Sequence, residues 1–158
     1  NVLKVYDGVA KEYEALSGRF YPKLDRYRTE DADFVVVVMS SASGVVKDVV
    51  DELREQGIKA GCLRVRMFRP FPAEEAAAAL GGAKAVAVLG RALSIGGTAP
   101  LAAEVKSALY DSGKSIPVQS CVYGLGGRDF FPQYARDLFM DLAAGKVSRE
   151  ERYLGLLE

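Results

Sequence analysis

The run Phe34-Val35-Val36-Val37-Val38-Met39 decides the fold. Six consecutive apolar residues, four of them valine, are typical of a central strand that is buried on both faces of a parallel sheet. The next residues, Ser40-Ser41-Ala42-Ser43-Gly44, offer hydroxyl groups that predict a capped helix start. The spacing of the apolar residues after them predicts a helix that ends at Gly57. A buried strand followed directly by an amphipathic helix predicts a βαβ unit and hence an α/β fold.

The same alternation continues along the chain. Further apolar runs predict strands at residues 59–65, 85–89 and 117–123. Helices are predicted to begin at Ala73, at Pro100 with Thr98 as the cap, and at Pro132. The string Ser148-Arg149-Glu150-Glu151 matches a capping box and predicts a short last helix. Together these patterns predict an α/β fold with three layers, in which helices lie on both faces of a mostly parallel sheet.

Residues 1–32 differ from the remainder of the chain. Their apolar spacing predicts a helix around residues 9–16, followed by an aromatic-rich connector. We therefore predict an N-terminal helix and connector at residues 1–32 and an α/β domain at residues 33–158. The sequence begins at Asn1 rather than at Met, and we expect an excised segment or a processed product.

Composition excludes several classes of protein. The 158 residues include 21 Lys and Arg against 21 Asp and Glu, so no net charge attracts the chain to nucleic acid. Every apolar run is far shorter than the about 20 residues that cross a bilayer, and no signal-peptide pattern is visible, so we expect no membrane partner. The sequence has no histidine, which excludes Ser-His-Asp catalysis and histidine metal ligands within it. Cys62 and Cys121 lie in predicted strands without a C-x-x-C pair, which favours buried thiols and a cytoplasmic location.

Three loops follow the carboxyl ends of predicted strands, where open α/β sheets bind ligands. Residues 40–44 could present helix N–H groups to an anion, but they lack a phosphate-loop pattern, so helix capping is the favoured interpretation. Residues 91–98 combine Arg91 with two glycines ahead of a helix. Either this loop contacts an anion, or Arg91 pairs with a neighbouring acid or backbone carbonyl, and we favour the second interpretation.

The third loop contains Gly124, Gly126 and Gly127, followed by Arg128 and Asp129. Its N–H groups could form an anion nest beside Arg128. However, Asp129 would repel a bound phosphate, and the glycine spacing departs from the G-x-G-x-x-G of dinucleotide sites. We therefore favour a structural turn whose two charges brace the loop or reach a partner.

Three arginines, Arg64, Arg66 and Arg69, lie in or just after the strand predicted at residues 59–65. Alternation along the strand sends Arg64 and Arg66 to one face, which is unusual for a strand covered by helices. That face is predicted to lie in solvent or against another chain. Because arginine is enriched at subunit interfaces, we expect an interface.

Several strings together resemble one family. They are YRTEDADFVVVVMSSASGVVKDVVDELREQGIKAGCLRVRMFRPFPAEE at residues 27–75, KAVAVLGRALSIGGTAPLAAEVKSALY at residues 84–110 and VYGLGGRDF at residues 122–130. They resemble the C-terminal part of the alpha subunit of 2-oxoacid:ferredoxin oxidoreductases, the pyruvate synthase family. The resemblance implies a transketolase C-terminal-like α/β domain, in agreement with the alternation of strands and helices.

The resemblance also implies cofactors and partners. Enzymes of this family use thiamine diphosphate and Mg²⁺ to decarboxylate a 2-oxoacid oxidatively, and [4Fe–4S] clusters pass the electrons to ferredoxin, usually with coenzyme A as acyl acceptor. The implied partners are the remaining alpha-subunit domain and the beta, gamma and delta subunits or domains, which hold these cofactors. Because this sequence has neither a Gly-Asp-Gly diphosphate motif nor a cysteine cluster, we predict no catalytic, cofactor-binding or metal-binding residue in it.

We therefore expect an assembly and loop-support domain that is inactive when isolated. The interface or loop-support candidates are Arg64, Arg66, Arg69, Arg91, Gly124, Gly126, Gly127, Arg128 and Asp129. Pyruvate is the expected substrate of the whole enzyme, with oxalate, 2-oxoglutarate and branched-chain 2-oxoacids as open alternatives. Two other functions stay open: a free-standing flavodoxin-like module that binds a nucleotide or phosphate, and a regulatory interaction domain.

Overall fold

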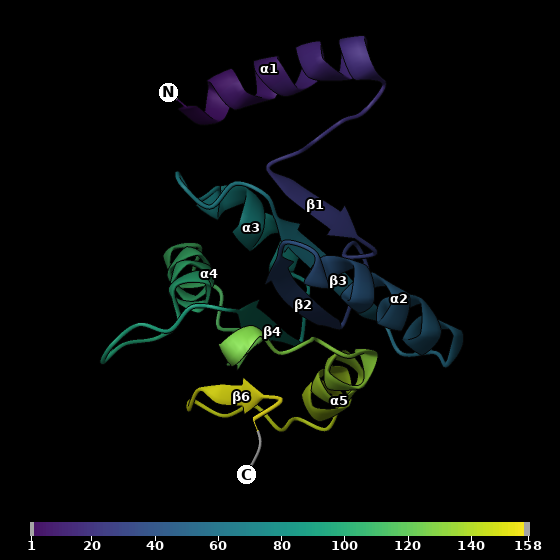
Figure 1. Cartoon of the computed structure of the whole chain (residues 1–158), viewed down its shortest axis with the longest axis vertical. Coiled ribbons are helices and arrows are strands. Elements are labelled where there is room, and N and C mark those ends of the chain that lie inside the picture. Colours follow the sequence, from purple (N-terminus) through teal and green to yellow (C-terminus); the bar gives the residue numbers. More distant parts are fainter. Residues whose placement is uncertain (1, 157–158) are drawn as a thin grey trace.

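The computed structural model describes residues 2–156, which form one six-stranded sheet between helices (Figure 1). The strand order is β1-β3-β2-β4-β5-β6. The strands are β1 Leu24–Tyr27, β2 Phe34–Met39, β3 Ala60–Val65, β4 Ala85–Gly90, β5 Val118–Tyr123 and β6 Arg152–Leu154. The helices are α1 Val2–Ser17, α2 Ala42–Glu55, α3 Ala73–Leu80, α4 Pro100–Asp111 and α5 Pro132–Ala143, with a 3-10 turn η1 at Leu125–Gly127.

The expected central strand is confirmed. Strand β2 lies between β3 and β4 and is parallel to both, and the side chains of residues 35–38 have no exposed surface. Val36 and Val38 pack with residues of α2 and α5, whereas Val35 and Val37 pack with residues of α3 and α4 on the opposite face. The valine run is therefore apolar throughout because helices cover both faces of the strand.

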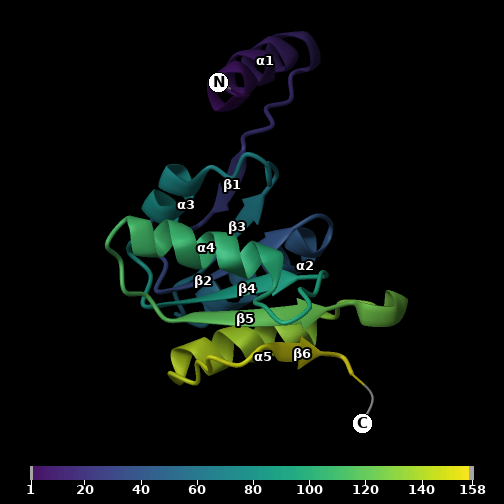
Figure 2. The same ribbon diagram turned by 90° about the vertical axis from the view of Figure 1, so that its left-hand side faces the viewer.

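The helices form two layers, as predicted. Helices α3 and α4 lie in front of the sheet in Figure 2, and α2 and α5 lie behind it. Every neighbouring pair of strands is parallel except β1 and β3, which are antiparallel. The predicted α/β fold with three layers and a mostly parallel sheet is confirmed. Among residues 2–156, no helix combines the length and apolar character that crossing a membrane requires.

Two predicted helix caps are wrong. Helix α2 begins after Ser41, but no side-chain hydrogen bond caps it. The backbone of Ser41 is already helical (φ −67°, ψ −30°), whereas a capping hydroxyl needs an extended backbone to reach the N–H groups. Helix α4 begins after Ala99 rather than Thr98, and the N–H of Ala99 donates to Oε2 of Glu151 at 3.4 Å.

The predicted last helix at residues 148–151 is also wrong, because this segment leads into strand β6. The Ser148 hydroxyl accepts the N–H of Glu150 at 3.0 Å, not that of Glu151 as a capping box requires. The carboxylate of Glu151 instead accepts the hydroxyl of Ser120, a buried residue of β5, at 2.6 Å. Bonds to β5 thus outcompete the local helix signal.

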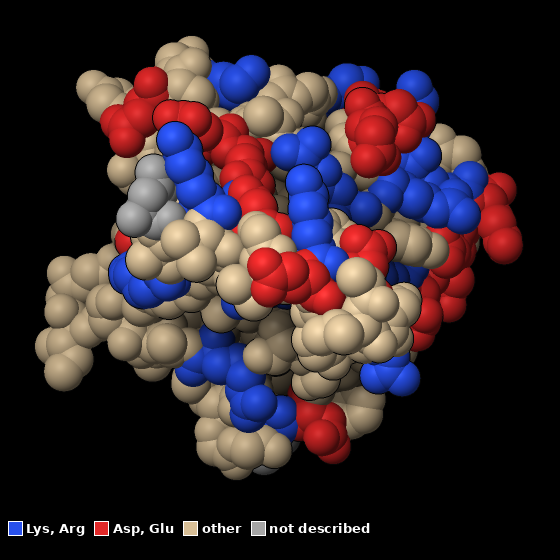
Figure 3. Space-filling view, turned by 90° about the horizontal axis from the view of Figure 1, so that it is seen from above, with Lys and Arg blue, Asp and Glu red and all other residues tan. Residues whose placement is uncertain are grey.

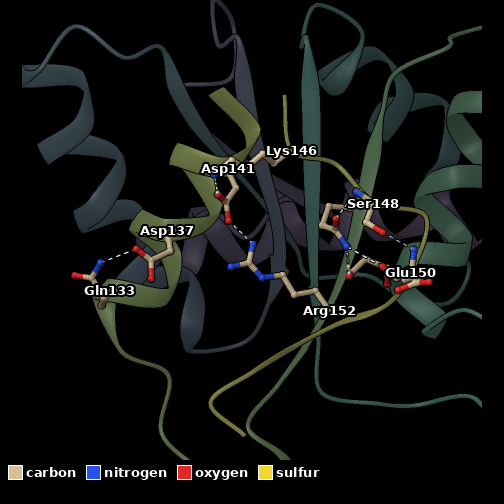
Figure 4. A network of polar contacts seen from close by, with 9 residues as sticks. Gln133, Asp137, Asp141, Lys146, Ser148, Glu150 and Arg152 are labelled. Carbon is tan, nitrogen blue, oxygen red and sulfur yellow. Dashed lines mark hydrogen bonds and ion pairs between the residues drawn. The ribbon is translucent and has the colours of Figure 1, made fainter. Parts of the chain in front are cut away.

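Two further contacts hold the segment against the sheet. The side-chain amide of Gln119 in β5 accepts the N–H of Ser148 at 2.8 Å and donates to the carbonyl of Glu150 at 3.0 Å. Arg152 in β6 reaches α5, where its Nη1 donates to Oδ2 of Asp141 at 2.5 Å (Figure 4). The last strand is therefore tied to both β5 and α5.

The N-terminal region contains a strand that the sequence did not predict. The expected helix is present and longer than predicted, since α1 covers Val2–Ser17, and a connector at residues 18–23 separates it from β1. Strand β1 pairs with β3 although it lies within residues 1–32, where only a helix and a connector were expected. The division of the chain at residue 32 stays a prediction.

Candidate functional site at the carboxyl edge of the sheet

Three loops meet at the carboxyl edge of the sheet and enclose a cleft of about 310 Å³. The chain leaves β2 through α2 to reach β3 on one side, while β4 adjoins β2 on the other, so β2 and β4 flank the topological switch point. Open α/β sheets commonly bind ligands at this place. The residues that line the cleft are Ser40, Ser41, Ala42, Val45, Arg91, Tyr123, Gly127, Arg128, Asp129 and Phe130.

The loop after β2 turns tightly into α2. Ser40 has a left-handed backbone (φ 61°), which is uncommon for a residue with a side chain. Its carbonyl accepts both the hydroxyl of Ser43 at 2.8 Å and the N–H of Ser43 at 3.3 Å. The turn is therefore fixed by Ser43, which is buried, rather than by the hydroxyl of Ser41.

Arg91 crosses from the loop after β4 to the loop after β5. Its Nη2 donates to the carbonyl of Gly124 at 3.3 Å, and its guanidinium lies 5.9 Å from the ring centroid of Tyr123. A Cβ added at Gly124 would lie only 2.9 Å from Nε of Arg91. Arg91 thus pairs with a backbone carbonyl, one of the two structural partners expected for it.

The glycine-rich loop is a left-handed turn. Gly124, Gly126 and Gly127 all have positive φ, at 69°, 66° and 78°, a region that favours glycine. After the turn, Nη1 of Arg128 donates to the carbonyl of Gly155 just beyond β6. Asp129 is exposed, and within residues 2–156 its carboxylate has neither a hydrogen bond nor an ion pair. Arg128 and Asp129 therefore do not pair with each other.

An aromatic pair forms the floor of the cleft. Tyr123 is buried, and its ring centroid lies 4.9 Å from that of Phe130, which in turn lies 6.1 Å from Tyr134 of α5. Burial raises the pKa of Tyr123 above its ordinary value, and the nearby Arg91 opposes this shift. Neither Tyr123 nor Phe130 was predicted as a site residue, although Tyr123 directly precedes the glycine-rich loop and Phe130 directly follows Asp129.

Arg64 of β3 and Arg66 just after it lie elsewhere, and of the two only Arg66 has a charge partner among residues 2–156. Arg66 pairs with Asp25 of β1 at 3.4 Å and lies over the ring of Tyr21, while Lys47 of α2 shares the same carboxylate at 2.9 Å. Arg64 is half-buried and stands opposite Asp25 in the β1–β3 register. This face holds a cluster of charges around Asp25, but the Nε atoms of Arg64 and Arg66 are buried without a hydrogen-bond partner among residues 2–156. An interface with another chain on this face stays a prediction.

Arg69 lies outside this cluster. Its Nη2 pairs with Oε1 of Glu104 in α4 at 2.9 Å, and its guanidinium lies 4.1 Å from the ring centroid of Phe68. Of the nine candidate residues, the structure brings Arg91, Gly127, Arg128 and Asp129 to the cleft, with Gly124 and Gly126 in the adjoining turn. It does not bring Arg64, Arg66 or Arg69 to the cleft.

The available donor groups do not suit a metal or a cluster. Residues 2–156 contain no group of three or more His, Cys, Asp or Glu side chains placed to hold a metal ion. Cys62 and Cys121 lie in β3 and β5, and burial raises the pKa of each thiol to about 12. Because metals and iron–sulfur clusters bind the thiolate, these two residues are poor ligands.

Tyr6-Asp7-Gly8 resembles the Gly-Asp-Gly motif of diphosphate sites in two of its three residues, but its Asp7 is not placed to bind a metal ion. Asp7, in Tyr6-Asp7-Gly8, lies within helix α1 rather than in a loop, and it pairs with Lys23 at 2.8 Å. A diphosphate site needs exposed N–H groups and a metal ligand together, and a helix interior offers no free N–H groups. The Tyr6-Asp7-Gly8 string therefore does not form a diphosphate and Mg²⁺ site, and the two buried thiols do not fit a [4Fe–4S] cluster.

Comparison with known proteins gives the family. The sequence profile of the pyruvate:ferredoxin oxidoreductase core domain II matches residues 32–135. The chain belongs to this family. Its matched part begins just before β2 and ends within α5, so it includes the whole switch-point region.

Relatives of known sequence are subunits of oxidoreductases. The pyruvate synthase subunit PorA of Thermotoga maritima is 49% identical over 159 residues, which cover 100% of this chain and 41% of the relative. The PorA of Methanosarcina barkeri is 46% identical and covers 78% of this chain and 31% of the relative. The ketoisovalerate oxidoreductase subunit VorA of Pyrococcus horikoshii is 41% identical and covers 93% of this chain and 39% of the relative. The chain thus spans about two-fifths or less of the length of these relatives.

A solved structure supports the fold. The 2-oxoglutarate:ferredoxin oxidoreductase from Magnetococcus marinus aligns with a TM-score of 0.56 at 20% identity. The alignment covers 83% of this chain and 21% of that chain. At this identity the likeness concerns the fold of the chain alone.

Proposed function

We propose that the chain is a non-catalytic assembly domain of a thiamine diphosphate-dependent 2-oxoacid:ferredoxin oxidoreductase. The proposal rests on the match to domain II, together with the absence of a metal-ligand group among residues 2–156. In this proposal the enzyme oxidatively decarboxylates its 2-oxoacid at residues outside this chain, and the chain itself is inactive when isolated.

Thiamine diphosphate, Mg²⁺ and the [4Fe–4S] clusters are proposed to lie in other parts of the complex. The two buried thiols cannot supply the four cysteine ligands of a cluster. The proposed partners are the remaining alpha-subunit domain and the beta, gamma and delta subunits or domains, with ferredoxin as the electron acceptor. A subunit role agrees with the names of the PorA and VorA relatives. We place the complex in the cytoplasm, where two unpaired thiols stay reduced.

Pyruvate is the proposed substrate of the complex. The relative at 49% identity is named as a pyruvate synthase subunit, and the ketoisovalerate oxidoreductase relative is less similar, at 41%. Coenzyme A is the proposed acyl acceptor. Neither molecule is proposed to touch this chain.

The interface candidates divide into two groups in this proposal. Arg128 and Asp129 are exposed at the cleft mouth and are proposed to meet a neighbouring domain or subunit. Arg66, Arg69, Arg91 and the three glycines are proposed to support the loops, because the partners of these arginines lie within this chain and the glycines form the turn. Arg64 makes no hydrogen bond or ion pair within residues 2–156 and is proposed as an interface residue. A subunit contact through exposed charges would be sensitive to charge reversal.

Calorimetry on the isolated chain tests this proposal. Thiamine diphosphate is titrated into the 158-residue chain in the presence of Mg²⁺, and thermal unfolding is recorded with and without both. We expect no binding and no change of the unfolding temperature at micromolar ligand, because a ligand that binds the native state must stabilise it. Micromolar binding would contradict the proposal.

The cleft supports a second candidate function, a flavodoxin-like module that binds a nucleotide or phosphate. Arg91, Arg128 and the first turn of α2 converge on the switch point, where such ligands bind. In that case inorganic phosphate or flavin mononucleotide would bind the isolated chain, and Arg91→Ala would abolish binding. The proposed assembly role instead predicts no binding of either ligand.

A further inference from the structure

Helix α1 carries an apolar stripe that stays largely exposed within residues 2–156, although the ring of its Tyr13 lies 5.6 Å from that of Tyr21. Its members are Val2, Val5, Val9, Tyr13 and Leu16. They are spaced by three, four, four and three residues, which places them on one side of a helix. Their exposed fractions run from 46% for Tyr13 to 87% for Leu16. Apolar residues gathered in this way on a helix mark an interaction surface, whereas scattered ones need no explanation.

The helix is held in place by contacts of Tyr6, Asp7 and Tyr13 with the connector at residues 18–23. Asp7 pairs with Lys23 at 2.8 Å, and Lys23 also pairs with Glu75 of α3 at 2.7 Å. The hydroxyl of Tyr6 donates to the carbonyl of Tyr21 at 3.0 Å. These contacts hold α1 at one end of the molecule, away from the sheet (Figures 1 and 2). The stripe stays more than half exposed at Val2, Val5, Val9 and Leu16.

Matches to relatives indicate what covers the stripe. The domain II profile begins at residue 32 and so leaves α1 out. The match to the Thermotoga maritima PorA includes the whole chain, but it covers only 41% of that relative. Helix α1 is thus shared with PorA but lies outside the domain II match. Most of the PorA polypeptide lies outside the matched region and is available to pack on it.

A second copy of this chain is a poorer occupant. A 16-residue helix is about 24 Å long, so a stripe about 10 Å wide buries roughly 240 Å² per partner. Stable interfaces between separate chains bury about 800 Å² per partner. Packing within one polypeptide needs no such area, because the covalent link supplies a high effective concentration.

The face around α1 carries acidic and basic side chains interspersed (Figure 3), so no single-sign patch favours a charged partner instead.

We infer that the stripe of α1 packs against an apolar surface of the same alpha-subunit polypeptide, in the part that lies outside these 158 residues. This inference rests on the proposed function, since it takes the chain as one part of a PorA-type subunit. Helix α1 then serves as the joint through which the assembly domain is fixed to its neighbouring domain. An isolated helix of this length is marginal in water, so α1 needs this contact for its stability.

Hydrogen exchange of α1 in two proteins tests the inference. One is the isolated 158-residue chain, and the other is a chimeric alpha subunit in which this chain replaces the matching region of the Thermotoga maritima PorA. We expect the amides of residues 2–17 to exchange at least about tenfold more slowly in the chimera. The double variant Val5→Glu/Val9→Glu is expected to remove this protection. Protection of the β2 amides reports that the domain is folded in every sample.

A matched control places the same two charges on the other side of the helix. Lys4 and Lys11 are exposed and lie opposite the stripe, so Lys4→Glu/Lys11→Glu should retain the protection. If the chimera does not fold, the part of PorA outside the match is joined to the chain through a flexible Gly/Ser linker, which keeps the covalent link, and the same protection is expected.

Two results would overturn the inference. One is equal exchange of α1 in the isolated chain and in a folded protein that carries the PorA part by a covalent link. The other is a dimer of the isolated chain at micromolar concentration that Val5→Glu/Val9→Glu dissociates, since the occupant would then be a second copy. Thiamine diphosphate binding to the isolated chain tests the proposed function without involving α1, so the two failures are distinguishable.

Discussion

At the scale of single residues, Gly124 controls how the loop after β5 is held. It needs a left-handed backbone (φ 69°), and it also leaves room for the guanidinium of Arg91. Arg91 uses that room to reach the Gly124 carbonyl and thereby joins two loops of the cleft. The same residue therefore sets both the turn and its tie to the neighbouring loop.

Replacing Gly124 with alanine should cost more stability than replacing Gly126. Both residues have positive φ, so each change costs about 1–2 kcal/mol in backbone strain. Only at Gly124 would the new Cβ displace Arg91, since nothing lies within 4 Å of a Cβ at Gly126. The displaced hydrogen bond adds about 1 kcal/mol. Urea unfolding of Gly124→Ala and Gly126→Ala measures the difference, and equal losses would show that Arg91 does not depend on this glycine.

The buried thiols predict a loss of stability in alkali. Burial raises the pKa of Cys62 and Cys121 to about 12 in the folded chain, so both keep their protons while the unfolded thiols lose theirs from about pH 9. The unfolded state then binds fewer protons, and stability falls as pH rises from 9 towards 12. Each thiol contributes a slope of up to about 1.4 kcal/mol per pH unit.

Unfolding in urea between pH 8 and 10.5 measures this slope. The double variant Cys62→Ala/Cys121→Ala is less stable at every pH because it leaves cavities, but its slope should be shallower. Lys23 has a raised pKa because it bonds to Asp7 and Glu75, and it adds a slope of the same sign at higher pH in both proteins. Equal slopes in the two proteins would mean that the thiols are accessible to solvent.

At the scale of elements, strand β6 depends on one carboxylate. Glu151 accepts the hydroxyl of Ser120 and the N–H of Ala99, so it links β6 to β5 and to the start of α4. Glu151→Ala would leave the buried Ser120 hydroxyl without a partner, at a cost of about 1–3 kcal/mol. We expect this loss in urea unfolding, together with faster hydrogen exchange in residues 152–154.

The neighbouring acid provides the control for this change. Glu150 is exposed, and within residues 2–156 its carboxylate makes no hydrogen bond or ion pair. Glu150→Ala should therefore change stability by less than about 0.5 kcal/mol. Similar losses for the two variants would remove Glu151 from its proposed role in holding β6.

The elements that the sequence predicted correctly are those whose signal is local. The valine run of β2 and the apolar face of α4 both carry their full pattern within a few residues, and both are confirmed. Strands β1 and β6 have 4 and 3 residues and form only because β3 and β5 offer ladder partners. The capping box at residues 148–151 was misleading because Gln119 and Ser120 bind that segment from a distant strand.

The candidate site was partly predictable for the same reason. Arg91 and the glycine-rich loop follow strands, and the meeting of strand ends at one sheet edge could be expected from a parallel sheet. Alternation also placed Arg64 and Arg66 on one face, but it could not show that Asp25 lies there, since Asp25 belongs to the unpredicted strand β1. Contacts between residues close in sequence were thus predictable, whereas contacts that depend on the pairing of distant strands, such as Arg66 with Asp25, were not.

At the scale of the whole molecule, residues 2–156 combine a sheet packed on both faces with two surfaces that stay largely exposed. The sheet has a buried core on each face, whereas the stripe of α1 and the cleft mouth at Asp129 remain exposed. The stripe lies on α1 and the cleft mouth lies after β5, so the domain can contact two different neighbouring domains or subunits at once. We propose that these surfaces serve assembly and not the chemical step.

Charge reversal at the cleft mouth tests that claim in the assembled enzyme. The chimeric alpha subunit is prepared with Asp129→Lys, with Asp48→Lys on the exposed side of α2 as the matched control, and mixed with the partner subunits of the Thermotoga maritima enzyme. The measurement is the assembled fraction together with the rate of pyruvate oxidation per assembled complex. We expect Asp129→Lys to weaken association about tenfold, equivalent to about 1.4 kcal/mol, with an unchanged rate per complex, and Asp48→Lys to change neither. Unchanged assembly with a collapsed rate per complex would contradict the account.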